Sequence, residues 1–177
     1  MQVDFIRDQF MYAAVLGVFG MVWFGWGQEN PPRKWRVPLG IGSGLSIAVA
    51  VAGAILAFRH WGDASALSLP GAYRNFGIVF GVEVLFIVAG ILVLSRWHRA
   101  RFISSWTAFV VGIHFFPLAW IFQDGYLHLL GAMVVIAAVV PVLLSKRTAI
   151  SVSAMNGAGA GLVLLAFAVR GLVTGFL

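Results

Sequence analysis

Six apolar runs, each about long enough to cross a bilayer, divide this chain of 177 residues. A hydrocarbon core of ~30 Å needs about 20 residues of helix, and backbone groups in lipid must be hydrogen-bonded within the segment. The runs therefore predict membrane-spanning helices over residues 9–27, 38–58, 76–95, 102–122, 125–144 and 149–169. The expected fold is an all-α, polytopic transmembrane bundle of six helices, forming a single domain over residues 1–177.

The composition agrees with a membrane protein and excludes other classes. The chain is 61% hydrophobic and 10% charged, whereas soluble domains are nearer half apolar and a quarter charged. A soluble enzyme and a disordered chain are therefore excluded. The net charge is +6, but the basic residues are scattered between apolar runs, so we expect no nucleic-acid partner. The chain has no cysteine, which excludes disulfides, a thiolate nucleophile and Cys-ligated metals.

Basic residues are distributed unequally between the two faces of the predicted bundle. Loops one, three and five carry eight Lys or Arg residues, and the other face carries four. Because cytoplasmic loops are enriched in Lys and Arg, we expect both termini on the non-cytoplasmic side. The stretch before the first run is not positively charged, so that run is interpreted as a retained span and not as a signal peptide. The expected location is the cell membrane, as a multi-pass protein.

Small residues recur at every fourth position in three of the runs. These motifs are Gly40-x-x-x-Gly44, continued by Ala48 and Ala52, then Gly77-x-x-x-Gly81 and Gly157-x-x-x-Gly161. This spacing allows two helix backbones to approach closely in lipid. We expect tight helix pairs, either within one chain or across a homodimer, with the lipid bilayer as the other partner.

Two ionisable side chains, Glu83 and His114, lie well inside predicted spans. An ionisable residue within a span is costly unless it is paired or hydrated, so each one is a candidate for function. At ~1.5 Å rise per residue, Glu83 lies ~10 Å and His114 ~12 Å below the same face of the membrane. We therefore expect the two side chains to meet and to form an intramembrane polar site.

Five further polar residues gather near the same face. Asp124 lies in the turn between spans four and five, and His128 follows it, ~5 Å into span five. Arg170 ends span six on this face, and Arg74 and Asn75 precede span three there. We expect these residues to support the site formed by Glu83 and His114.

The most specific local motif is Gly-Ile-His-Phe-Phe-Pro-Leu at residues 112–118. Pro117 has no backbone N–H, and its ring crowds the carbonyl of Ile113, which predicts a kink within one turn of His114. Such a kink beside an intramembrane histidine can form a site or a hinge. Asn156 lies nearer the opposite face and is expected to make a packing hydrogen bond.

Three short motifs resemble those of a group of small bacterial six-span membrane proteins of unknown function. They are Trp-Phe-Gly-Trp-Gly-Gln-Glu-Asn-Pro-Pro at residues 23–32, Arg74-x-Phe76 followed by Glu83, and Gly112-x-His114-Phe115-x-Pro117-Leu118. The resemblance extends over most of the chain. It implies a bacterial inner-membrane protein with a cluster of Arg74, Glu83 and His114, and it implies no activity.

Several functions are compatible with the pair of Glu83 and His114. One is a small proton- or ion-linked transporter or channel, because titratable groups beside a helix break occur in membrane proton and ion pathways. Another is a structural polar network that fixes helix register, with function carried by partner proteins or lipids. A third is a metal site, because the candidate ligands His114, Glu83 and His128 suit zinc and other first-row metals. No other cofactor is expected.

An enzyme is the remaining alternative. The chain has no His-Glu-x-x-His, no Gly-x-Ser-x-Gly and no paired acidic motif, so the spacings that usually report hydrolytic chemistry are missing. Only Glu83 and His114, acting as general acid and base, remain for catalysis. No catalytic residue is therefore assigned.

Overall fold

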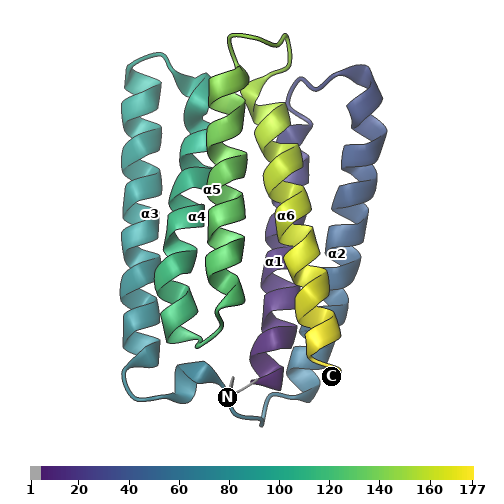
Figure 1. The fold of residues 1–177 in the computed structure, drawn as a ribbon, viewed down its shortest axis with the longest axis vertical. Coiled ribbons are helices and arrows are strands. Elements are labelled where there is room, and N and C mark those ends of the chain that lie inside the picture. Colours follow the sequence, from purple (N-terminus) through teal and green to yellow (C-terminus); the bar gives the residue numbers. More distant parts are fainter. Residues whose placement is uncertain (1–4) are drawn as a thin grey trace.

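The computed structural model describes residues 5–177 and contains six long helices in that part of the chain (Figure 1). They are α1 Ile6–Gly27, α2 Arg36–Arg59, α3 Ala72–Arg96, α4 Ile103–Ile121, α5 Tyr126–Leu144 and α6 Val152–Thr174. Three short 3-10 helices lie in the connections, η1 Arg33–Trp35, η2 Ala66–Ser68 and η3 Ala100–Phe102. All six long helices are apolar and long enough to cross a membrane. The predicted all-α, six-helix fold is confirmed, and the chain is a multi-pass membrane protein.

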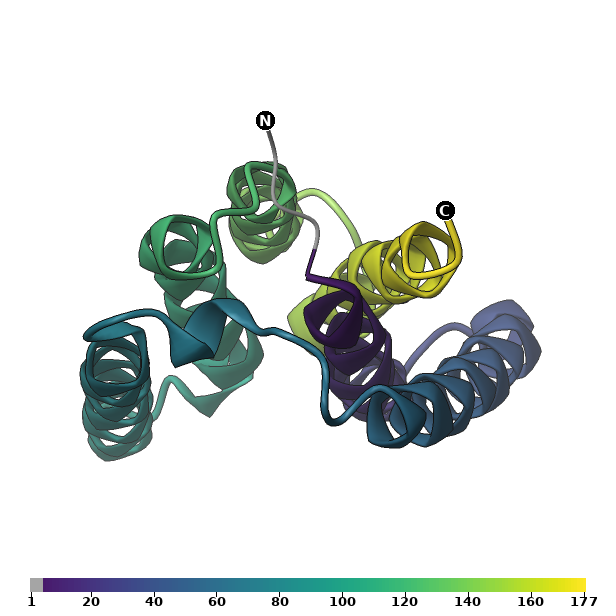
Figure 2. The same ribbon diagram turned by 90° about the horizontal axis from the view of Figure 1, so that it is seen from below.

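The helices form two groups of three. In the first group α1 contacts both α2 and α6, and in the second α4 contacts both α3 and α5. The groups are joined where α6 lies against α5 and α4. Seen along the helices, the connection from α2 to α3, which contains η2, crosses the gap between α1 and α3 (Figure 2). This connection, the turn from α4 to α5, the start of α1 and the end of α6 share one end of the bundle, here called the lower end (Figure 1).

Polar contacts set the ends of the helices where the observed bounds depart from the predicted spans. Ser151 Oγ accepts a hydrogen bond from the backbone N–H of Ala154 (3.2 Å), so α6 begins at Val152 and not at residue 149. At the other end α6 continues past residue 169 to Thr174. Arg170, which was predicted to end the span, therefore lies inside the helix, where its side chain has partners.

Glycine brings the backbones of α1 and α6 into contact. A Cβ atom at Gly157 would overlap the backbone of Gly27, and one at Gly161 would lie 2.9 Å from the ring of Phe24. Since only glycine permits this approach, the predicted motif at residues 157 and 161 is a helix-packing motif. It holds α1 and α6 of the first group in backbone contact.

The other two small-residue motifs face away from the rest of the chain. An added Cβ atom would meet nothing within 4 Å at Gly44, Gly77 or Gly81. The helix α2 contacts α1 instead through Gly42 and Gly53, whose added Cβ atoms would meet Phe24 and Ala13 at 2.8 Å. A shift of two residues turns a helix by about 200°, so within this chain α2 packs on α1 through a different face from the one that carries Gly40 and Gly44. The homodimer stays a prediction.

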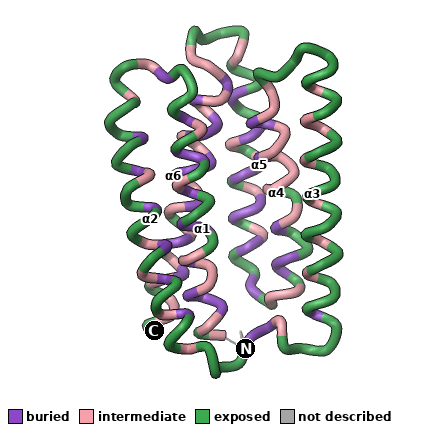
Figure 3. Tube along the Cα trace, turned by 180° about the vertical axis from the view of Figure 1, so that it is seen from behind, coloured by how far each residue is buried: buried purple, intermediate pink, exposed green. Residues whose placement is uncertain are grey.

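The helix α3 lies at the edge of the bundle (Figures 1 and 3). Its only buried residue is Ala72, at its first position. Farther along, Trp106 of α4 donates an indole N–H hydrogen bond to the carbonyl of Phe86 (2.9 Å). Gly90 leaves room for this indole, since an added Cβ would overlap it. The helix is therefore held by α4 on one side and leaves its α1 side lightly packed.

Candidate functional site

Glu83 of α3 and His114 of α4 lie in contact within the bundle. Glu83 Oε1 is 3.2 Å from His114 Nδ1, and the two side chains are 10% and 16% exposed. They come from consecutive helices that run in opposite directions, at the depth where the sequence placed both. The structure thus brings together the two ionisable residues that lie deepest in the spans.

Hydrogen bonding fixes which ring nitrogen of His114 carries a proton. Nδ1 lies 2.8 Å from the carbonyl oxygen of Val111, and a carbonyl oxygen can only accept. Nδ1 therefore donates, and in the neutral ring Nε2 is the acceptor. Among residues 5–177 no hydrogen bond reaches the carboxylate of Glu83. This carboxylate keeps its acceptor capacity for water or a ligand.

The pair lies in the wall of a cavity between α1, α3 and α4. The cavity has a volume of about 310 Å³, within the range of small-molecule sites. Most of its wall is apolar, and its rings come from all three helices: Tyr12, Phe19, Phe76, Phe80, Phe115 and Phe122. Ser65 and Leu67, from the connection between α2 and α3, line it as well. The arrangement is an apolar, aromatic chamber with one polar pair.

Two charged residues of α1 bind the connection between α2 and α3 at the lower end. Asp8, which is buried, accepts a hydrogen bond from the backbone N–H of Ala66 (2.7 Å). Arg7 donates to the carbonyl of Trp61 (2.9 Å), and its guanidinium lies 5.4 Å from the centre of the Trp61 ring. Both residues also line the cavity. Their charged groups are thus already hydrogen-bonded, whereas within residues 5–177 the carboxylate of Glu83 has the 3.2 Å contact with His114 and no hydrogen bond.

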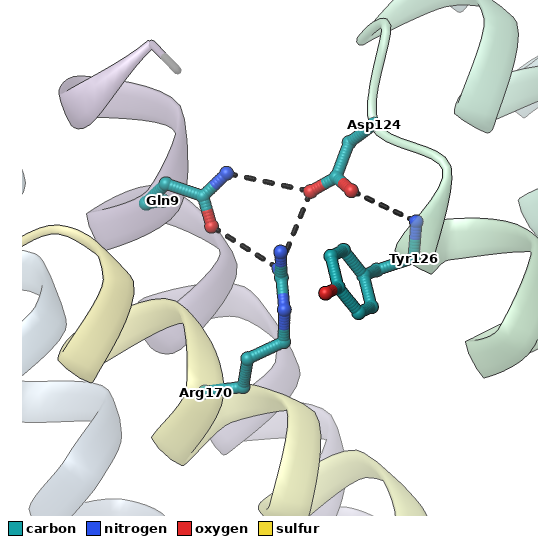
Figure 4. Close-up of polar contacts among 4 residues, drawn as sticks. All are labelled: Gln9, Asp124, Tyr126 and Arg170. Atoms are coloured by element: carbon teal, nitrogen blue, oxygen red, sulfur yellow. Dashed lines mark hydrogen bonds and ion pairs between the residues drawn. The ribbon is translucent and has the colours of Figure 1, made fainter. Parts of the chain in front are cut away.

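A second polar cluster joins α1, α6 and the turn from α4 to α5 (Figure 4). Arg170 donates from Nη1 to Asp124 Oδ2 and to Gln9 Oε1, both at 3.3 Å. Gln9 Nε2 also donates to Asp124 Oδ2 (3.3 Å). Asp124 Oδ1 accepts from the backbone N–H of Tyr126 (2.9 Å), and the guanidinium lies 3.9 Å from the centre of the Tyr126 ring. This network connects three parts of the fold at the lower end.

The residues predicted to support Glu83 and His114 lie elsewhere. Asp124 and Arg170 form the network just described. Arg74 and Asn75 are exposed in the first turn of α3, and Arg74 precedes Glu83 by nine residues, which is ~13 Å along a helix. The cluster of Arg74 with Glu83 and His114 that the family resemblance implied is therefore absent from the described structure.

The candidate metal ligands are also not grouped. His128 lies on α5 beside the rings of Phe116 and Trp120, with ring centres 5.8 and 6.1 Å away, and it does not line the cavity. Over the described range no three His, Cys, Asp or Glu side chains lie close enough together to hold a metal ion. Glu83 and His114 thus lack the third ligand that the sequence offered in His128.

Helix α4 continues through Pro117 to Ile121. Because Pro117 has no N–H, the carbonyl of Ile113 lacks its usual donor one turn farther on. His114 lies in the same turn and points its Nδ1 at the carbonyl of Val111. The kink itself stays a prediction, but a break in the hydrogen-bond ladder does lie beside the polar pair.

Sequence reasoning missed two buried residues and misjudged a third. Asp8 and Gln9 lie in the first turns of α1 and are both 4% exposed. The available signal was their position at the membrane face that also carries Asp124 and Arg170. Asn156 is fully buried, but neither atom of its amide has a hydrogen-bond partner in the described structure, so the predicted packing hydrogen bond was wrong.

The two polar clusters have different settings. Glu83 and His114 line the cavity, whereas Gln9, Asp124 and Arg170 are absent from its wall and bond mainly to one another. The pair in the cavity is therefore the candidate functional site. Comparisons with protein-family models, with curated proteins and with solved structures find no match to this chain.

Proposed function

We propose that this protein is a small proton-linked membrane transporter in which Glu83 and His114 bind the proton. The observation that carries the proposal is the position of the pair in the wall of a cavity of about 310 Å³. A purely structural pair would be enclosed by packed side chains, whereas this one faces open space. A carboxyl group and an imidazole can each take up and release a proton, and such groups within spans mark proton routes in membranes.

The other titratable and charged groups facing the cavity come from α1. They are Arg7, Asp8 and Tyr12. Arg7 is bound to Trp61, and Asp8 is bound to the backbone of the connection between α2 and α3. Glu83 and His114 are consequently the groups free to take up a proton or to bind a solute.

The weak packing of α3 supports a transport cycle. This helix contacts α4, η2 and η3 and buries a single residue, so little contact resists a movement of α3 relative to α1. Such a movement would open the cavity and expose the pair. Transporters expose one site alternately to the two sides of the membrane through movements of this kind.

The charge distribution supports an orientation for the transporter. The upper end, counting the terminal helix residues Arg36 and Arg96 with the connections, carries eight Lys or Arg residues, and the remainder of the chain carries four. By the positive-inside rule the upper end faces the cytoplasm. The connection that contains η2 then faces outward, in the inner membrane of a bacterium.

Replacing Glu83 with Gln is expected to abolish proton flux without unfolding the protein. The substitution keeps the size of the side chain but removes the group that exchanges the proton. The protein is reconstituted into liposomes that contain a pH-sensitive dye, a potassium diffusion potential is imposed, and internal acidification is followed. Wild-type protein should acidify the liposomes faster than protein-free liposomes, and Glu83→Gln and His114→Gln should match the protein-free rate.

The matched control is Glu29→Gln, the same substitution at an exposed position near the upper end. This variant should retain the wild-type flux, and all variants should keep the wild-type melting temperature. An unchanged flux in Glu83→Gln would contradict the proposal. So would a melting temperature that falls in Glu83→Gln but not in Glu29→Gln, because the pair would then be a structural contact.

A further inference from the structure

The walls of the cavity indicate what kind of solute fits it. Six aromatic rings from α1, α3 and α4 face the cavity, and Trp61 lies at its lower end. The face of an aromatic ring is electron-rich and attracts cations within about 6 Å of its centre. Apolar groups are stabilised by the same surfaces through burial. The chamber thus suits a solute that combines apolar substituents with positive charge.

The charged groups in the cavity wall also favour a positively charged solute. Asp8 and Arg7 are each partnered by the connection between α2 and α3. Glu83 is 10% exposed and receives no hydrogen bond within residues 5–177, and it lines the cavity. A carboxylate that is largely removed from water is costly, and a bound cation would offset this cost more fully than the 3.2 Å contact with His114 does. The Nδ1–H of His114 is directed to the carbonyl oxygen of Val111.

We infer that the cavity binds small lipophilic organic cations, such as quaternary ammonium or phosphonium ions, with Glu83 as the counter-ion. The inference rests on the proposed transport function and names its class of substrate. The charge of the solute is balanced by the carboxylate of Glu83, and its apolar substituents contact the rings of Tyr12, Phe76 and Phe80. Protons and the cation then compete for one carboxylate.

Two probe ions of nearly equal size and opposite charge test the inference. Tetraphenylphosphonium and tetraphenylborate are each equilibrated with purified protein, and binding is measured by equilibrium dialysis. Wild-type protein and Glu29→Gln should bind the phosphonium saturably, and Glu83→Gln should bind it about tenfold more weakly, as expected for loss of a charge-assisted contact. Tetraphenylborate should show no saturable binding to any of the proteins.

A matched pair of aromatic substitutions locates the bound ion. Phe80 lines the cavity, whereas Phe86, on the same helix and about equally exposed (54% and 53%), does not line it. Phe80→Ala should weaken phosphonium binding, and Phe86→Ala should leave it unchanged. Equal binding of the two probe ions, or unchanged binding in both Glu83→Gln and Phe80→Ala, would overturn the inference.

Lowering the pH provides a test that needs no variant. Phosphonium binding to wild-type protein should fall as the pH falls, because protonation of Glu83 removes the counter-ion and protonation of His114 adds a competing charge. A pH-independent affinity would contradict the inference even if Glu83→Gln failed to fold.

Glu83-dependent phosphonium binding without proton flux would refute the transport proposal alone. Glu83-dependent flux without phosphonium binding would refute the cation inference alone.

Discussion

Replacing Asp124 with Ala is expected to lower the free energy of unfolding by about 3 kcal/mol, because removing one partner of a buried pair leaves the other charge unpaired. Asp124 is 5% exposed and accepts hydrogen bonds from Arg170, Gln9 and the backbone of Tyr126. Its loss would disconnect α1 and α6 from the turn between α4 and α5. Thermal or denaturant unfolding in detergent measures the effect.

The control is the ion pair of His60 and Asp63, whose side chains are 39% and 50% exposed. Exposed pairs contribute at most about 1 kcal/mol, so Asp63→Ala should change stability little. The double variant Asp124→Ala with Arg170→Leu should be more stable than Asp124→Ala alone, because no charge is left unpaired. Equal stability losses in Asp124→Ala and Asp63→Ala would show that the network does not hold the helices together.

Adding one methyl group at Gly157 is expected to destabilise the protein by about 3 kcal/mol, the upper part of the range for overpacking. The Cβ atom of Gly157→Ala would overlap backbone atoms of Gly27, and it would lie 2.6 Å from the backbone oxygen of Trp23. A side chain could rotate away from such a clash, but a backbone cannot. The helices α1 and α6 would therefore have to separate, which a lower melting temperature would report.

Gly44→Ala is the matched control, because an added Cβ there meets nothing within 4 Å. Alanine is a better helix former than glycine by about 1 kcal/mol, so this variant should be neutral or more stable than wild type. If Gly157→Ala were as stable as Gly44→Ala, the close contact of α1 with α6 would be wrong. The same comparison tests which face of α2 packs, since Gly44 belongs to the motif that faces away from the chain.

The number and approximate bounds of the helices could be predicted from the sequence because lipid imposes a length on every apolar run. The depth of Glu83 and His114 followed from the rise per residue along each predicted span. Consecutive helices are usually neighbours in space. That reasoning works along one axis, the membrane normal. It placed both residues at one level, and the structure brings them into contact.

Lateral arrangement could not be predicted in the same way. Small residues at every fourth position occur on two faces of α2, and spacing alone does not show which face meets α1. Asp124 and Arg170 lie near the membrane face from which the depth of the predicted site was measured, yet they bond to each other and to Gln9 of α1. Which helices lie beside α1 depends on packing between residues far apart in the chain, such as Gly27 with Gly157. A single sequence does not reveal such pairs.

The ends of α6 show a related limit. The prediction ended this span at residue 169 because a charged residue follows, but the helix continues to Thr174 with Arg170 inside it. The guanidinium is accommodated by Asp124, Gln9 and the ring of Tyr126. Hydropathy treats each charge as unpaired and therefore predicts that a span ends before it. A helix can continue past a charged residue that has partners on other helices, as α6 does at Arg170.

The claim that Glu83 and His114 face a cavity open to solute can be tested most directly by cysteine accessibility. The chain has no native cysteine, so a single introduced thiol is observed without background. Val111 lines the cavity one turn from His114. Ile113, on the same helix, does not line it and is exposed on the outer surface of the bundle, where lipid surrounds it. The thiolate is the reactive species and forms only in contact with water.

Membrane vesicles containing Val111→Cys or Ile113→Cys are treated with a charged, membrane-impermeant thiol reagent. We expect Val111→Cys to react and Ile113→Cys to remain unmodified, with tetraphenylphosphonium slowing the reaction of Val111→Cys. A Val111→Cys thiol that stays unmodified with reagent on both sides of the membrane, or that reacts no faster than Ile113→Cys, would contradict an accessible cavity and with it the role assigned to Glu83 and His114.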